Sequence, residues 1–316
     1  MAAVTAPETS SPLPARPSGW GRRRRLLIVI VAVWTVVVAG LAVWSVGRDP
    51  ATVPEQRDIA QALPELRQAV GVVFAAAGGP GRAVVLGDLT VSQECRVTPV
   101  RAGVIAVRDV RVYLRAGEAR AGVEAIAAAL PESYRVEVTS GRGGTEFALH
   151  GDAGNFIGVD GDLNAGEQVL TLRVSSGCRP LSSGQLDKSD PATGPAPAAL
   201  GAALAALGAP GVPAGSPGPS GSAVPGVSPS LSGAKPSPAQ ALAVRAVACP
   251  DGGTAGTYTV DGVAAPADLG RSLRGVASGA SVIRSGSSGW AYRTGNDSVV
   301  VLVDGKRLRV SATTAC

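Results

Sequence analysis

The feature that most constrains this chain is an apolar segment, residues 26–46, that contains no formally charged side chain. As a helix its 21 residues extend about 31 Å, which matches the hydrocarbon core of a bilayer. Trp20 and Trp44 lie near its two ends, where indole rings favour the membrane interface. The segment predicts a transmembrane helix over residues 26–46, so a folded core has to come from the rest of the chain.

The charges beside this segment predict its orientation. Four arginines, Arg22–Arg25, precede it, whereas Arg48 after it is balanced by Asp49. The positive-inside rule then gives a short cytoplasmic tail, residues 1–25, and an extracytoplasmic C-terminus. A cleaved signal peptide is the alternative, although signal peptides usually have apolar cores of about 7–15 residues. We therefore expect a single-pass protein of the cell membrane.

The net charge of +5 does not point to nucleic acid. Residues 1–47 hold five arginines and one glutamate, so the remainder has 24 basic and 23 acidic residues. The excess basicity therefore lies beside the apolar segment, and we expect the membrane, not nucleic acid, as a partner. Only three of the 29 basic residues are lysine. This arginine bias, together with 42 glycines and 24 prolines, favours a GC-rich, actinobacterial source.

Residues 48–187 predict an extracytoplasmic α+β domain. Apolar residues at helical spacing predict a helix over residues 55–77, and a second helix is predicted over 117–130. Alternation with period two predicts strands between residues 83 and 114 and again between 134 and 175. Because the late strands are separated by short Gly, Asp and Asn turns, we expect an antiparallel sheet.

The composition changes abruptly over residues 188–238. Residues 189–238 hold 11 prolines and 9 glycines, no aromatic residue, and only Asp190 and Lys235 as charges. Such a segment buries too little apolar area to offset its ordering entropy, so it predicts a disordered linker in which 198–207 is transiently helical. Residues 239–316 follow as a second, smaller α+β domain with six strands around a helix over 266–276.

The two predicted domains look like an internal duplication. The string Ser-Gly-x-x-Gly follows the helix in both, at residues 140–144 and 285–289. Val-Asp-Gly recurs in the late hairpins, at residues 159–161 and 303–305. Each domain also has one cysteine on an early strand and another at its end, in the same alternation register as the core residues.

Four cysteines in an exported chain predict two disulfides. Their spacings of 83, 71 and 67 residues resemble no zinc site, which needs close ligand pairs. If the domains are duplicates, the bonds are Cys95–Cys178 and Cys249–Cys316. We expect each pair to lie on strands that are neighbours in an antiparallel sheet, within the Cα separation that a disulfide requires.

One acidic string has the spacing of a calcium loop. Asp160, Asp162 and Asn164 follow the D-x-D-x-N pattern, whose oxygens can converge on a hard cation. However, Ala165 stands where such a loop needs Gly, and Thr171 where it needs Glu. A plain hairpin turn is the preferred interpretation, and no metal site is assigned.

No catalytic or cofactor-binding residue is assigned. The single histidine, His150, lies near Asp152, but no Gly-x-Ser-x-Gly nucleophile motif is present, so we interpret it as a surface histidine. Residues 141–144 are rich in glycine but precede a predicted strand instead of a helix, which disfavours a phosphate loop.

Binding or scaffolding in a bacterial cell envelope is the functional interpretation that remains. The partner would be an envelope protein, a wall polymer or a lipid. Six arginines lie close together in the sequence: Arg96, Arg101, Arg108, Arg111, Arg115 and Arg120. They are consistent with an anionic partner, although the acidic residues between them favour an ordinary solvated surface. The alternatives are an envelope hydrolase with carboxylates such as Glu146 and Asp152, and a membrane sensor with an outer ligand-binding region.

Overall fold

The structure is a computed structural model that describes residues 20–48, 57–164, 166–181, 185–209 and 241–316. The chain divides into two units, Met1–Thr52 and Val53–Cys316, which are treated separately. The first unit contains the helix α1 (Trp20–Arg48). Its stretch Arg23–Trp44 is long and apolar enough to cross a membrane, and none of it is buried. The predicted apolar helix is therefore present.

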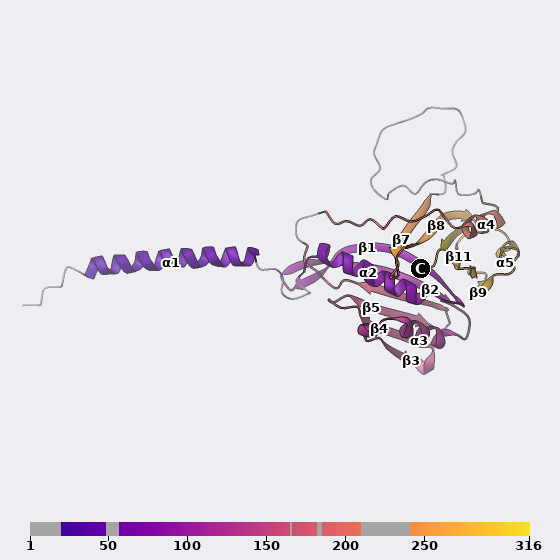
Figure 1. Ribbon diagram of the computed structural model, residues 1–316, viewed down its shortest axis with the longest axis horizontal. Helices are drawn as coiled ribbons and strands as arrows, with labels where there is room; N and C mark the ends of the chain where they lie inside the picture. The colour runs from indigo at the N-terminus through magenta and orange to yellow at the C-terminus, as the bar shows by residue number, and fades with distance from the viewer. Residues whose placement is uncertain (1–19, 49–56, 165, 182–184, 210–240) are drawn as a thin grey trace, which may run out of the picture. The chain divides into compact units, whose positions relative to one another are not determined.

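The second unit consists of two halves with the same kinds of element in the same order (Figure 1). The first half contains α2 (Ile59–Ala77), β1 (Arg82–Thr98), β2 (Arg101–Leu114), α3 (Ala119–Ala129), β3 (Glu137–Gly141), β4 (Glu146–Asp152), β5 (Gly158–Asn164) and β6 (Val169–Ser175). The second half contains α4 (Ala198–Ala206), β7 (Leu242–Ala248), β8 (Thr254–Ala264), α5 (Leu269–Arg274), β9 (Ser281–Gly286), β10 (Gly289–Thr294), β11 (Asp297–Asp304) and β12 (Arg307–Thr313). The α+β class is confirmed.

Each half forms one antiparallel sheet of six strands. The strand order is β1-β2-β6-β5-β4-β3 in the first half and β7-β8-β12-β11-β10-β9 in the second. In both sheets the last strand of the half lies next to the second strand, and each sheet begins with a two-strand hairpin. The topology of the two halves is thus identical.

Helices α2 and α3 cover one face of the first sheet (Figure 1). The carboxylate of Asp58 caps α2 by accepting a hydrogen bond from the Ala60 amide at 2.7 Å. The apolar side of α2, which includes Leu66 and Val70 at 0% exposure, packs on alternating apolar residues of the strands. Val123 and Ile126 of α3 belong to the same core.

The first part of the predicted disordered linker is instead folded, because it contains helix α4. Leu200, Ala203 and Leu204 are fully buried and pack against the second sheet with Tyr258 and Val310. These apolar residues recur at helical spacing and form one stripe, which an average over fifty Pro- and Gly-rich residues conceals. Residues 185–209 are therefore ordered, while 210–238 lie outside the described residues.

The two halves pack directly on each other. Ala83 and Tyr113 of the first sheet form a small buried cluster with Ile283, Ala291 and Val300 of the second. The interface also passes beneath α2. There, a Cβ at Gly71 would lie 2.2 Å from the Ala248 carbonyl oxygen, so only glycine fits at that helical position.

Candidate functional site

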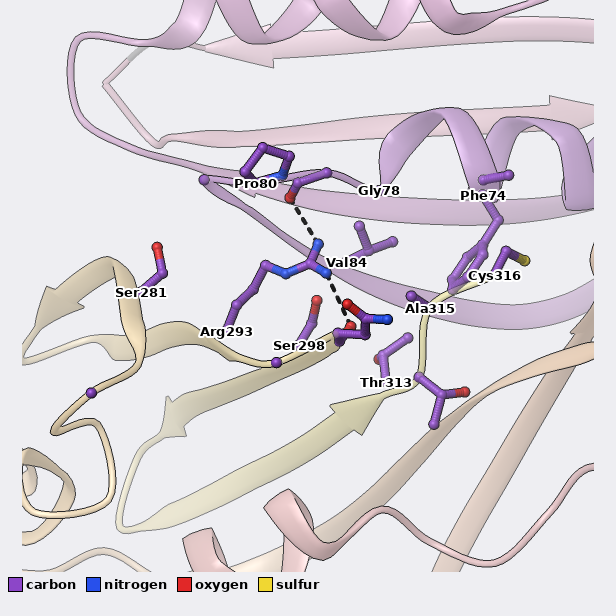
Figure 2. Close-up of a pocket in the computed structure, with 17 residues that line it drawn as sticks. Phe74, Gly78, Pro80, Val84, Ser281, Arg293, Ser298, Thr313, Ala315 and Cys316 are labelled. Atoms are coloured by element: carbon purple, nitrogen blue, oxygen red, sulfur yellow. Dashed lines mark hydrogen bonds between the residues drawn. The ribbon is translucent and has the colours of Figure 1, made fainter.

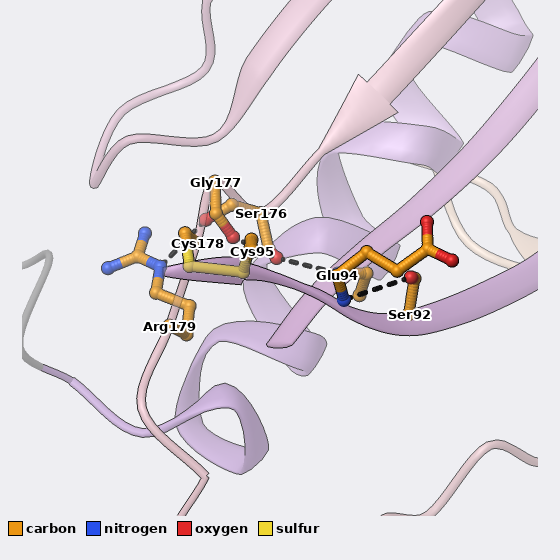
Figure 3. The surroundings of a disulfide bond; sticks show 8 residues. Ser92, Glu94, Cys95, Ser176, Gly177, Cys178 and Arg179 are labelled. Atoms are coloured by element: carbon orange, nitrogen blue, oxygen red, sulfur yellow. Dashed lines mark hydrogen bonds between the residues drawn. A yellow bond between two sulfur atoms is a disulfide. The ribbon is translucent and has the colours of Figure 1, made fainter. Parts of the chain in front are cut away.

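The first disulfide joins strands that are not neighbours. Cys95 on β1 and Cys178, just after β6, have Cα atoms 5.8 Å apart, and Figure 3 shows their surroundings. The predicted pairing is confirmed, but the expectation of adjacent strands was wrong, because β2 lies between β1 and β6. Gly103 of β2 makes the crossing possible, since a Cβ there would lie 2.6 Å from the Cys178 sulfur.

The second disulfide repeats this arrangement. Cys249 follows β7 and Cys316 follows β12, with Cα atoms 5.4 Å apart and β8 between the two strands. Each bond therefore ties the edge strand of its sheet to the third strand across the second. No free cysteine is found among the described residues, so these sulfurs supply no nucleophile.

His150 makes an exposed pair with Asp160. The two side chains lie on the neighbouring strands β4 and β5, with His150 Nδ1 2.9 Å from Asp160 Oδ1. Both side chains are more than half exposed. Asp152 instead lies 3.7 Å from Arg135 and accepts a hydrogen bond from the Gly154 amide. In the described part of the chain no hydroxyl is hydrogen-bonded to His150, so the pair is a surface contact.

The acidic string forms a strand, not a loop. Asp160, Asp162 and Asn164 alternate along β5, where successive residues on one face are about 6.6 Å apart. The Asn164 side chain accepts a hydrogen bond from the Gly166 amide at 3.0 Å. Among the residues that the structure describes, no group of three or more His, Cys, Asp and Glu side chains is placed to hold a metal ion. The preferred interpretation as a turn was wrong, because these residues pair with β4 and β6.

The two carboxylates named for a hydrolase do not form a pair. Glu146 begins β4 and Asp152 ends it, so they are separated by six residues, or about 20 Å. Paired catalytic acids of glycosidases lie about 5–9.5 Å apart. The glycine-rich residues 141–144 form the short turn between β3 and β4, and the element that follows them is a strand.

The predicted basic stretch is dispersed. Arg96 and Arg101 lie at the exposed tip of the β1–β2 hairpin, and Arg120 forms an exposed ion pair with Glu124 at 2.8 Å. Arg115 donates to the Ser281 hydroxyl in the other half. Arg108 is buried. The six arginines therefore do not form one binding surface.

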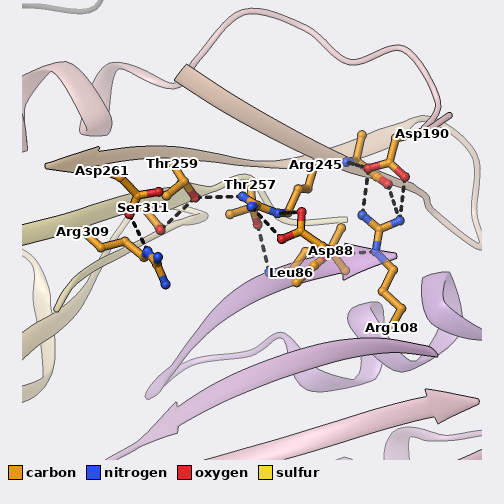
Figure 4. Close-up of polar contacts among 12 residues, drawn as sticks. Leu86, Asp88, Arg108, Asp190, Arg245, Thr257, Thr259, Asp261, Arg309 and Ser311 are labelled. Carbon is orange, nitrogen blue, oxygen red and sulfur yellow. Dashed lines mark hydrogen bonds and ion pairs between the residues drawn. The ribbon is translucent and has the colours of Figure 1, made fainter. Parts of the chain in front are cut away.

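A buried polar network joins the halves instead (Figure 4). The network lies on the face of the second sheet that α4 does not cover. The hydroxyls of Thr257 and Thr313 are hydrogen-bonded at 2.8 Å, and those of Thr259 and Ser311 at 3.0 Å. The Leu86 amide on the edge strand β1 donates to the Thr257 hydroxyl at 3.0 Å. The Thr257 hydroxyl thereby satisfies a backbone amide of the edge strand that would otherwise be unpaired in the interface.

Two ion pairs flank this network (Figure 4). Arg108 and Asp190 form a bidentate pair, with both N–O distances 2.8 Å, and the Arg108 side chain is only 3% exposed. Asp190 also accepts from the Ala246 amide at 2.8 Å, which links the segment before α4 to both halves. Arg245 pairs with Asp88. The hydrogen bond from Arg245 is the main reason that the pKa of Asp88 lies below its usual range, and burial of Asp88 opposes this shift.

An open cavity of about 680 Å³ lies where the halves meet (Figure 2). The first half contributes the end of α2 and the glycine-rich turn of residues 78–81; the second contributes the β10–β11 turn and residues 313–316. Arg293 crosses between them. Its Nη1 donates to the Gly79 carbonyl at 2.7 Å, and its Nη2 to the Asn296 carbonyl at 3.1 Å.

The sequence analysis missed this junction. The signals were present, because Arg293 lies on the same side of its strand as Ala291, and Thr257 and Thr259 alternate with Tyr258 and Val260. Arginine and threonine at inward positions indicate a polar interface. That interface cannot be recognised until the partner strand β1 is known, which a single sequence does not provide.

Comparisons with known proteins assign no family. No protein-family model matches the sequence, and no curated protein matches it. One solved structure with detectable similarity is the crystal structure of a DUF4853 family protein from Actinomyces odontolyticus. It is 16% identical, and the match covers 43% of this chain and 76% of that one, with a TM-score of 0.29. A score this low supports no inference about fold or function.

Proposed function

We propose that this chain is a single-pass membrane protein whose disulfide-bonded unit, residues 53–316, binds or scaffolds a partner in a bacterial cell envelope. The observation that carries the proposal is α1. Its apolar side chains are exposed throughout, for example Leu26 at 64% and Trp34 at 70%. An apolar helix of this length matches the hydrocarbon core of a bilayer, which supports a membrane anchor.

The cysteines support the extracytoplasmic side. All four are paired, and structural disulfides persist in oxidising compartments. The arginines at 22–25 favour the same orientation, because basic residues are retained on the cytoplasmic side. Binding is preferred to hydrolysis because Glu146 and Asp152 lie at opposite ends of one strand, whereas the junction offers a cavity.

We also infer that the halves arose by duplication. The support is a shared strand order, a helix before the first strand of each sheet, and a disulfide that crosses the second strand in each. Helix α4 then corresponds to α2. A duplicated chain of this kind offers a partner two related modules with one interface between them.

The natural lysines test the proposed location without any substitution. Lys188 and Lys306 are exposed and follow the apolar segment, and no lysine precedes it. An amine reagent that cannot cross membranes should therefore modify both lysines in intact cells, while the N-terminal amine reacts only after permeabilisation. A cytoplasmic protein serves as the control for leakage.

Two results would contradict the proposal. Modification of Lys188 and Lys306 only after lysis would place the unit in the cytoplasm. Release of the whole chain from membranes at high pH would show that α1 does not anchor it.

A further inference from the structure

The cavity at the junction is lined by Arg293, a cation for which the described residues supply no ion-pair partner. Arg293 donates to three backbone carbonyls, those of Gly79, Arg82 and Asn296, and these are neutral acceptors. Arg82 likewise donates to the Gly78 carbonyl. Among the ion pairs of the described residues, none includes either arginine, so two guanidinium groups share one turn without a carboxylate in contact.

Arg82 shows the cost of this arrangement. Its Nη1 is buried and has no hydrogen-bond partner among the described residues. Burial lowers the pKa of Arg82, and the charge of Arg293 lowers it further. A buried donor on a cation is expensive when it is unsatisfied. An anion bound beside Arg293 would offset the repulsion between the two guanidinium groups.

Asp297, an acid whose charge interacts with that of Arg293, compensates poorly. Burial raises the pKa of Asp297, so its environment disfavours the charged form, although Arg293 opposes that shift. On the other side of the turn, Glu118 is engaged with Arg115 at 3.9 Å. The cavity wall instead presents hydroxyls, those of Ser281 and Ser298. Since Arg115 donates to the Ser281 oxygen, the Ser281 proton remains able to donate to a ligand.

We propose that this cavity binds the anionic group of a small ligand, a phosphate or a carboxylate, with Arg293 as the principal cation. Guanidinium groups and hydroxyl donors suit both kinds of oxyanion. The volume of about 680 Å³ is within the range of small-molecule sites. This inference deepens the binding role proposed above by naming a site and a ligand class.

The test is thermal unfolding of the purified full chain in detergent. Sodium phosphate and sodium acetate are each compared with sodium chloride at equal ionic strength. At tenfold its Kd, a bound anion should raise Tm by about 3 °C. A shift with phosphate alone, acetate alone or both supports the site and assigns the class.

Two variants and a matched control decide whether the effect belongs to Arg293. Arg293→Gln removes the charge, and Asn296→Asp places an isosteric carboxylate on an exposed residue beside it. Both should abolish the shift. Arg307→Gln is the control, because Arg307 lies on the same sheet and its Nη1 also donates to a backbone carbonyl, that of Gly262 in β8, at 2.7 Å, yet Arg307 does not line the cavity.

The proposal is overturned if neither anion shifts Tm, or if both variants respond like the wild type. Should Arg293→Gln fail to fold, Asn296→Asp alone decides the question. Because the assay uses purified protein, its failure leaves the result of lysine labelling in cells untouched.

Discussion

The two halves share one topology but cover their sheets differently. In the first half α2 has 19 residues and α3 has 11, whereas α4 has 9 and α5 has 6. Four residues, 78–81, connect α2 to β1, but residues 207–241 separate α4 from β7. The face that the helices do not cover also differs between the two sheets. In the first sheet this face carries exposed charges such as Asp162 and Arg173, whereas in the second sheet it carries buried hydroxyl groups.

This difference teaches that the second half depends on the first. Short helices bury less apolar area, so a small half needs another source of stability. It obtains this from β1 and β2, which cover its hydroxyl-rich face, and from the disulfide at its end. The first half depends less on the second, because α2 and α3 cover one face of its sheet and form a core with its strands.

The largest expected effect comes from the disulfides. Closing loops of 83 and 67 residues stabilises the folded chain by about 4 kcal/mol each in the chain-entropy model, and the two values differ by only about 0.2 kcal/mol. Replacing Cys95 and Cys178 together by serine, or Cys249 and Cys316, should therefore cost similar amounts. Urea unfolding followed by circular dichroism measures both.

The same variants show whether the halves unfold together. Trp290 is the one tryptophan within residues 53–316 and reports on the second half. If the halves are coupled, loss of Cys95–Cys178 lowers the urea midpoint of the Trp290 signal as well. An unchanged Trp290 midpoint would mean that the halves are independent.

Removing Asp190 should have the next largest effect. Asp190→Ala leaves the buried guanidinium of Arg108 without its counter-charge, which costs about 3 kcal/mol. Arg120→Ala, which breaks the exposed pair with Glu124, should change the free energy of unfolding by only about 0.5 kcal/mol. Chemical denaturation compares the two. Equal, small effects would show that the segment before α4 is not part of the fold.

Leu204→Ala tests whether α4 corresponds to α2. Leu204 is 0% exposed, as is Leu66 in α2, so each substitution to alanine should cost about 2–3 kcal/mol. Leu181→Ala is the control, because Leu181 is 42% exposed and should lose much less. Thermal unfolding of the three variants is sufficient. An effect at Leu204 as small as that at Leu181 would restore the original prediction of a linker.

The smallest effect concerns the partly exposed ion pair between Asp88 and Arg245. Because the folded-state pKa of Asp88 is lowered, its carboxylate stabilises the fold above the unfolded pKa, about 3.9, and this is lost as pH falls through the folded value. Asp88→Asn should therefore destabilise at pH 7 by less than about 1 kcal/mol. The gap between wild type and variant should narrow below about pH 4, as Tm measured across pH would show. A gap that widens with acidity would contradict the assigned pair.

Periodicity was sufficient to predict most elements, because their apolar faces are amphipathic. Strand β2 (Arg101–Leu114) lies within the region of strands expected between residues 83 and 114, and α3 (Ala119–Ala129) lies within the helix expected over 117–130. Prediction failed where a pattern was short or needed a partner. Helix α4 has only nine residues, and Asp160–Asn164 resembles a turn unless β4 and β6 are known to flank it.

The candidate site was less predictable than the fold. Arg293 and Arg82 are 211 residues apart in the chain and meet only because the halves pack together. A single sequence contains no information about that packing. The cysteine pairing could be predicted because both halves repeat it, but the strand that each bond crosses could not.

The position of β6 and β12 within their sheets has a consequence for synthesis. In each half the strand that the ribosome makes last occupies the place beside the first hairpin. Since chains emerge N-terminus first, β1 and β2 wait as an isolated hairpin, which is marginally stable, until β6 arrives. The second half repeats the delay, because β12 (Arg307–Thr313) is the last strand of that half. Each half therefore stays incomplete until its last strand has been synthesised. In ribosome-bound chains that stop before residue 307, we expect the first half to be folded and the second half to be sensitive to protease.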